Sequence, residues 1–239
     1  MNRSNGLKTV AAGAAMLALS PAFAQSSVTL YGVVDTGIGW QNNQTTLGST
    51  SGGHAAVKMI NGVWAGSRFG VKGAEDLGGG TKALFVLESG LNSATGAQQY
   101  TNAMFGRQAW VGFSNQAWGS LTLGRQYASY YQLLSPFSPT NSLTGYYGAH
   151  PGDIDGLDTI YRANNTIEYT SPKLYGFTFG GSYSPGGVAG SLDAGSTWTA
   201  AIQYLNGPVG LAVGFSRINN STPGGGAFGG ESTTSNNGA

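Results

Sequence analysis

Few residues in this sequence could carry catalytic or metal chemistry. The chain contains no cysteine, and its two histidines, His54 and His150, lie far apart without neighbouring ligand residues. Without thiols, thiolate zinc sites, thiol catalysis and a disulfide framework are excluded. The isolated histidines do not fit a metal site or a Ser-His-Asp constellation. We therefore expect no metal, no cofactor and no enzymatic activity.

Charge is the chemistry that remains. Basic residues stand singly in or beside segments with a strand pattern, and three aspartates cluster in a long connection. Charges facing a narrow water-filled path select ions, because low-dielectric walls focus their field. Arginine suits such a role because it stays charged at any physiological pH. The residues in question are Arg68, Lys72, Arg107, Arg125, Arg162, Asp153, Asp155 and Asp158.

The composition differs from that of an ordinary soluble domain. Only 9% of the 239 residues are charged, against about 25% in typical soluble domains. Glycine occurs 41 times, and 11% of the residues are aromatic. The formal net charge of +1 falls to about −1 without Arg3 and Lys8. Neither value provides the basic face that nucleic acid requires.

The N-terminus has the three parts of a secretory signal peptide. Arg3 and Lys8 form a positive region, a short apolar stretch follows, and Ala22-Phe23-Ala24 matches an A-x-A cleavage site. We predict a signal peptide over 1–24 and a mature domain over 25–239. No later stretch approaches the roughly 20 apolar residues of a membrane helix.

Strand patterns dominate the mature chain. Apolar residues recur with period two, for example at Val209, Leu211, Val213 and Phe215, opposite Gly210 and Gly214. The segments predicted to be strands are 28–41, 57–74, 81–92, 103–115, 117–127, 161–171, 175–185, 196–206 and 208–219.

The second face of these strands distinguishes a barrel from a sandwich. A sandwich strand shows charged, solvated residues on its outer face, whereas this second face is small or weakly polar. That pattern fits one face on lipid and the other on a water-filled lumen. Short turns also alternate with long Gly/Ser/Thr/Asn-rich loops, as at the two ends of an outer-membrane barrel. We predict an all-β fold, a transmembrane antiparallel β-barrel.

Several ordered fragments resemble the trimeric general-diffusion porins of Gram-negative bacteria, especially the β-proteobacterial kind. The similarity spans roughly 27–219, and the ordered set is more specific than any one fragment. The fragments are 27–35 (SVTLYGVVD), 67–73 (SRFGVKG), 75–80 (EDLGGG), 107–113 (RQAWVGF), 121–126 (LTLGRQ) and 161–165 (YRANN).

The resemblance implies a barrel of 16 strands, a homotrimer, and a third loop folded into the lumen. The chain departs from the family at its C-terminus, where 224–239 is a Gly/Ser/Asn-rich stretch instead of an aromatic-ended strand. The nine strands predicted from the sequence cannot close an even-stranded barrel, and an open edge in lipid leaves backbone groups unsatisfied. We therefore expect the sequence to be the N-terminal portion of a longer porin.

The resemblance also assigns roles to the charges. Arg68, Arg107 and Arg162 stand where the family places constriction arginines, and Arg125 and Lys72 are second candidates. Arg68 alternates with Phe69 and so faces the lumen. Arg107 would lie on the same face as Ala109, so the sequence does not decide which way its side chain points. The alternative for each arginine is a rim position that tethers a loop.

The acidic candidates are less specific. By resemblance, Asp153, Asp155 and Asp158 line the pore from the connection 128–160. Alternatively these aspartates stabilise turns, or one or more of them binds a cation. Asp35 and Glu88 fall on predicted lumen faces and are further candidates for tuning the field.

The sequence therefore predicts an outer-membrane porin, a channel for passive diffusion of ions and small hydrophilic solutes. We expect lipid, lipopolysaccharide, the diffusing solutes and further copies of the chain as partners, and no nucleic acid. Two alternatives stay open at this point. One is a secreted β-sandwich or lectin-like binding protein, and the other is an outer-membrane enzyme or adhesin on a smaller barrel.

Overall fold

The computed structural model describes residues 27–44, 52–139, 141, 145, 157 and 162–219. None of the helices in these ranges is both long and apolar enough to cross a membrane. The elements in chain order are β1 (Ser27–Val33), β2 (Thr36–Gln44), β3 (His54–Asn61), β4 (Arg68–Gly78), β5 (Thr81–Gly90), β6 (Gln108–Asn115), β7 (Gly119–Tyr127), helix α2 (Ser129–Leu134), the 3-10 turn η2 (Ser135–Phe137), β8 (Arg162–Thr170), β9 (Phe177–Ser184), β10 (Thr197–Asn206) and β11 (Val209–Ile218).

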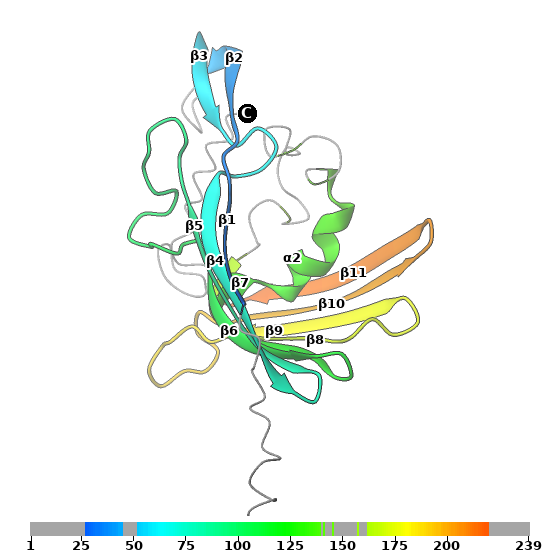
Figure 1. Cartoon of the computed structure of the whole chain (residues 1–239). Helices are drawn as coiled ribbons and strands as arrows, with labels where there is room; N and C mark the ends of the chain where they lie inside the picture. The colour runs from blue at the N-terminus through cyan, green and yellow to red at the C-terminus, as the bar shows by residue number, and fades with distance from the viewer. Residues whose placement is uncertain are drawn as a thin grey trace, which may run out of the picture.

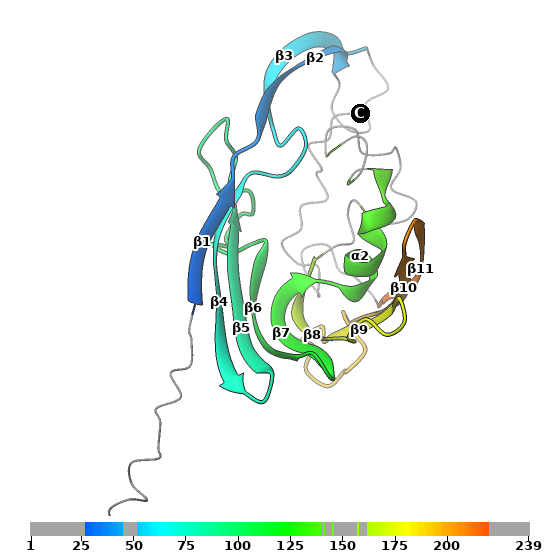
Figure 2. The ribbon, with the colours of Figure 1, turned by 45° about the vertical axis from the view of Figure 1, so that its right-hand side comes forward.

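Nine of the strands form one antiparallel sheet in the order β1-β4-β5-β6-β7-β8-β9-β10-β11 (Figure 1). Because neighbours in this sheet are antiparallel, its connections alternate between two ends. The short turns β4–β5, β6–β7, β8–β9 and β10–β11 share one end, and the long connections share the other. The sheet curves, and α2 lies on its concave side (Figure 2).

The polarity of this sheet is inverted relative to a soluble domain. The buried side chains among the described residues are mostly polar, including Glu88, Arg107, Arg162 and Glu168. The large apolar side chains are mostly exposed; Val213, for example, keeps 69% of its surface. An apolar outer face with a polar inner face is the arrangement of a barrel in lipid.

Two predicted strands are divided in the structure. The predicted segments 28–41 and 57–74 each break, and their outer parts form the separate two-stranded sheet β2–β3. The carboxylate of Asp35 causes the break, because it accepts the backbone N–H groups of Trp64 and Ala65 at 2.7 Å each. The Ser67 hydroxyl closes the junction by accepting the N–H of Asp35 at 3.0 Å.

Asp35 therefore sits at this junction, not in a continuous strand as predicted. Hydrogen bonds from the amides of Ala65, Trp64 and Val63 hold the pKa of the Asp35 carboxyl below its usual value. The predicted segment 103–115 is also shorter in the structure, since β6 begins at Gln108. The segment before it belongs to the connection that follows β5.

Candidate pore lining

An acidic side chain holds two arginines on the concave face of the sheet. Glu88 Oε1 accepts Arg107 Nε at 2.7 Å, and Glu88 Oε2 lies 3.6 Å from Arg68 Nε. The Tyr31 hydroxyl donates to the same Oε2 at 2.9 Å. These residues come from β1, β4, β5 and the loop before β6, so the sheet register brings the group together.

The register explains how Tyr31 reaches Glu88. Tyr31 pairs with Gly70 and Gly70 pairs with Glu88, so the three lie in one row across β1, β4 and β5. A Cβ atom on Gly70 would lie 2.7 Å from the Tyr31 ring and 2.8 Å from its hydroxyl oxygen. Glycine at this position therefore leaves the space through which the tyrosine crosses β4.

The facing of Arg107, open from the sequence, is settled by this contact. By parity it would share the outer face with Ala109, but β6 begins only at Gln108. Arg107 lies before the strand, and its guanidinium turns to the concave side to bond Glu88. Its side chain keeps only 2% of its surface.

A second group centres on two tyrosines. Arg162 donates through Nη1 to the Tyr100 hydroxyl and through Nη2 to the Tyr127 hydroxyl, both at 2.7 Å. Its guanidinium also lies 4.5 Å from the centre of the Tyr127 ring. Arg107 Nη2 donates to the same Tyr127 hydroxyl at 3.2 Å. Tyr127 therefore joins the Glu88 group to Arg162 in one continuous polar network.

The two second candidates among the cations, Arg125 and Lys72, make different contacts. Arg125 adjoins the network, since its guanidinium lies 5.7 Å from the centre of the Tyr100 ring. Its Nε donates to the Gly106 carbonyl at 2.6 Å and its Nη1 to Asn164 Oδ1 at 2.8 Å. Lys72 lies on the same concave face as Arg68, with its ammonium 5.4 Å from the centre of the Tyr31 ring. Asp153, Asp155 and Asp158 lie outside the described residues.

The start of the connection 128–160 lies inside the curve of the sheet (Figure 2). Gln203 Nε2 on β10 donates to the Leu133 carbonyl of α2 at 2.8 Å. Glycines on the concave face make room for the helix. A Cβ atom on Gly180 would lie 3.0 Å from Ser129 Cβ, and one on Gly214 would lie 2.8 Å from the Tyr130 ring.

This packing gives a prediction with a control in the same strand. We expect Gly180→Val to push α2 off β9 and lower the single-channel conductance, because the added atoms overlap Ser129 and Leu133. Such overpacking also destabilises by about 1–3 kcal/mol. Gly181 is the control, since its Cβ would point away from α2 and meet no atom closer than 3.8 Å. Equal conductance of Gly180→Val and Gly181→Val in planar bilayers would contradict this packing.

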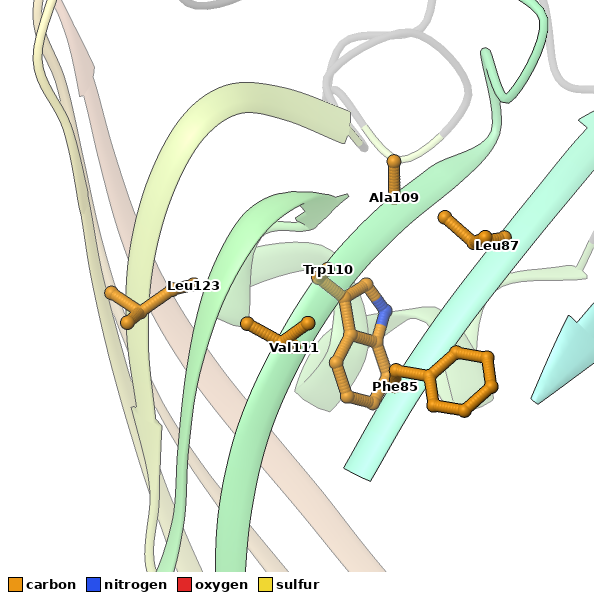
Figure 3. A pocket seen from close by; sticks show the side chains of 6 residues that line it. All are labelled: Phe85, Leu87, Ala109, Trp110, Val111 and Leu123. Carbon is orange, nitrogen blue, oxygen red and sulfur yellow. The ribbon is translucent and has the colours of Figure 1, made fainter. Parts of the chain in front are cut away.

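The opposite face of the same strands is apolar. Phe85, Leu87, Ala109, Val111 and Leu123 line an open hollow of about 400 Å³ on β5, β6 and β7, which Trp110 of the inward-facing row also borders (Figure 3). Its lining contains no carboxyl, hydroxyl, imidazole or amine side chain. The hollow can therefore contact apolar groups, but it offers no side chain for acid-base or metal chemistry.

Sequence reasoning did not identify Tyr100, Tyr127 or Glu168 as members of the lining, and it placed Tyr31 on the same face as Asp35 without giving it a role. For Tyr31 and Glu168 the strand period held the signal, because Leu30 beside Tyr31, and Ile167 and Tyr169 beside Glu168, are large and exposed. Tyr100 lies in the loop after β5, so the strand period could not predict which way its side chain faces. Tyr127 is the last residue of β7.

This arrangement defines a class of protein. An antiparallel sheet with an apolar convex face, a charged concave face and a loop inside its curve is the wall of an outer-membrane β-barrel. Among the described residues no group of three or more His, Cys, Asp or Glu side chains gathers as a metal site.

Comparison with known proteins gives the family. Residues 10–238 match the family described as Gram-negative porin, and this chain belongs to that family. It is 34% identical to an outer membrane porin protein of Bordetella pertussis, over 89% of this chain and 60% of the relative. It is 31% identical to outer membrane porin protein 32 of Delftia acidovorans, over 88% of this chain and 59% of the relative.

A solved structure shares the fold. The anion-selective porin from Comamonas acidovorans superposes with a TM-score of 0.65 at 27% identity, covering 82% of this chain and 59% of that chain. The chain thus spans about 60% of the length of the relatives that it matches. The predicted porin resemblance, the all-β membrane-barrel class and the outer-membrane location are confirmed. Family and fold exclude the alternatives of a secreted sandwich and of an enzyme.

Proposed function

We propose that this chain forms the wall of a water-filled channel through which ions and small hydrophilic solutes diffuse passively across the outer membrane. The observation that carries the proposal is the network of arginines on the concave face, opposite an apolar convex face. Lipid and lipopolysaccharide contact the convex face, and solutes pass along the concave one. Residues 1–24, which lie outside the described residues, serve as the export signal, and 25–239 belong to the barrel domain.

The channel prefers anions. Arg68, Arg107, Arg125 and Arg162 belong to or adjoin the concave-face network, while Glu88 is the carboxylate that pairs with two of them. The structurally similar porin from Comamonas acidovorans is anion-selective, which supports the same preference here. Asp153, Asp155 and Asp158 form the acidic side of the constriction, on the connection that contains α2.

Arg68 is the residue through which this preference is best tested. Its side chain keeps 25% of its surface, whereas that of Arg107 keeps 2%. We expect Arg68→Gln to lower the anion-to-cation permeability ratio about fivefold, because two unit charges 4 Å apart in water interact by about 1 kcal/mol. Arg162→Gln should shift the reversal potential in the same direction.

The measurement is the reversal potential in planar bilayers under a salt gradient. Lys173→Gln is the matched control, because it removes one positive charge in the short β8–β9 turn. An unchanged reversal potential in both arginine variants would remove Arg68 and Arg162 from the conducting path.

The channel assembles as a homotrimer. The support is the resemblance of the ordered fragments to trimeric porins together with membership of the family. SDS-resistant oligomers that dissociate on heating to a single monomer band, with a mass of three monomers by light scattering in detergent, would support it. A monomer that still conducts would rule it out.

A further inference from the structure

A buried carboxylate on the barrel wall contacts helix α2. Glu168 lies on β8 between Thr122 of β7 and Ser182 of β9, in a row that faces the concave side. It keeps 2% of its surface. Gln132 Nε2 of α2 donates to Glu168 Oε1 at 2.6 Å. The hydroxyl and backbone amide of Ser129 lie beside the same carboxylate.

No arginine or lysine satisfies this carboxylate within the described residues. Both ion pairs found there belong to Glu88, and residues 128–161 contain no lysine or arginine at all. Burying a carboxyl group without hydrogen-bond partners is unfavourable whether or not it carries a proton. The donors that Glu168 does have come from α2, so the helix and the carboxylate depend on each other.

The helix needs such an anchor. α2 has six residues, no side-chain cap at Ala128 and no acidic residue in its first turn. A helix this short is not stable by itself in water. Other polar contacts between the helix and the sheet are neutral, among them Gln203 to the Leu133 carbonyl at 2.8 Å, the Tyr130 N–H to Thr199 Oγ1 at 3.4 Å, and Gln132 Nε2 to the Tyr127 carbonyl at 3.2 Å.

The contact is also incomplete. Glu168 Oε2 and Ser129 Oγ are both buried, and neither makes a full hydrogen bond with a described residue. One strong bond, from Gln132, therefore carries most of the attachment between the carboxylate and the helix. Removing that single bond should be enough to change how tightly α2 lies on the wall.

We propose that Glu168 is a positioning residue that holds α2 against β8 and β9 and thereby keeps the channel at one width. The inference rests on the proposed function for its effect on conduction, but the attachment itself can be measured without any current. Glu168 acts through α2 and need not contact the diffusing ion.

The attachment is measured by thiol labelling. Ala201 lies between Gly180 and Gly214 in the sheet, beneath α2, and keeps 8% of its surface. Because the chain has no cysteine, an Ala201→Cys variant carries one thiol. We expect Glu168→Ala to raise its labelling rate by a water-soluble maleimide about two- to tenfold, the factor carried by one lost hydrogen bond of ordinary strength.

Two further variants keep this test decisive. Gln132→Leu breaks the same bond from the helix side, together with the 3.2 Å bond from Gln132 Nε2 to the Tyr127 carbonyl. It should raise the labelling rate at least as much, even if Glu168→Ala fails to assemble. Glu75→Ala, which removes an exposed carboxylate from β4, is the control and should leave the rate unchanged. An unchanged rate in Gln132→Leu and in assembled Glu168→Ala would overturn the proposal.

A reversible crosslink tests the effect on conduction. Ser129→Cys with Gly180→Cys places two Cβ atoms about 3.0 Å apart, a little under the roughly 3.5–4.5 Å of a disulfide. Because the cysteine at 180 itself presses on α2, the comparison is with the same cysteine pair in the protein that keeps Glu168. Under reducing conditions we expect noisier currents in Glu168→Ala than in that protein, and equally steady currents from both after oxidation. Noise that persists after complete oxidation would overturn the positioning role.

The two proposals fail differently. If the unmodified porin carried no current, the proposed function would fail, while the labelling comparison would still decide the role of Glu168. If the unmodified porin conducted and Glu168→Ala had the same labelling rate and the same current noise, the positioning role would fail and the channel would stand.

Discussion

Replacing Glu88 with alanine is expected to lower the free energy of unfolding by about 3–5 kcal/mol, because the change leaves a buried arginine without its counter-charge. That arginine is Arg107, whose Nε lies 2.7 Å from Glu88 Oε1 and whose side chain keeps 2% of its surface. The Tyr31 hydroxyl, which donates to Glu88 Oε2 at 2.9 Å, loses its acceptor as well.

Arg68 should respond far less to the same change. It lies 3.6 Å from Glu88, keeps 25% of its surface, and also donates to the Gly66 carbonyl at 3.0 Å. Exposed ion pairs contribute about 0–1 kcal/mol. The loss of Glu88 should also free positive charge near the solute path, so the surviving channels should become more anion-selective.

Urea unfolding of the porin purified from outer membranes, followed by tryptophan fluorescence, measures the stability loss. Glu88→Leu combined with Arg107→Met should be more stable than Glu88→Leu alone, because no unpaired buried charge is left. Glu75→Ala, an exposed carboxylate on β4, serves as the control. A loss below about 1 kcal/mol for Glu88→Ala would show that Arg107 is not buried in the assembled channel.

The facing of most strand residues could be predicted from the sequence because the side-chain period of a strand is two. Arg68 and Lys72 alternate with Phe69 and Val71, and the structure places both cations on the concave side with Tyr31 and Thr29. Glu88 likewise follows from Leu87 on the outer face. For these residues, the apolar side chains on one face of the strand were enough to predict which way the others point.

Other features depend on contacts that the strand period does not encode. Arg107 precedes β6, so its direction is set by its bond to Glu88 on the neighbouring strand. The break after β1 depends on Asp35 meeting the amides of Trp64 and Ala65, about thirty residues away in sequence. Such pairings become visible only when the register is known.

Glu168 shows a different limit. Its facing follows from Ile167 and Tyr169, which are both exposed on the outer face, so the sequence did contain the signal. Its role did not follow, because Gln132 lies 36 residues away and reaches it only through the fold of the connection. Sequence predicts which face a strand residue takes more readily than which loop covers it.

Exchanging Val71 and Lys72 is expected to destabilise the barrel by about 2–4 kcal/mol if the site lies near the bilayer midplane, and by less closer to the interfaces. Val71 lies between Leu30 and Leu87 in an outward-facing row, whereas Lys72 lies between Thr29 and Val86 in the inward-facing row. The exchange keeps composition and net charge. It moves one ammonium from the water-filled side of β4 to the lipid side.

A control variant separates the effect of removing the lysine from position 72 from the effect of placing it at position 71. Lys72→Val alone removes an exposed charge whose ammonium lies 5.4 Å from the Tyr31 ring centre, and we expect a change within about 0.5 kcal/mol, as for other exposed sites. Urea unfolding in phospholipid vesicles compares the two variants. An ammonium is penalised at position 71 only if hydrocarbon surrounds it. If the variant with Val71 and Lys72 exchanged were as stable as Lys72→Val, the convex face at Val71 would therefore not contact lipid.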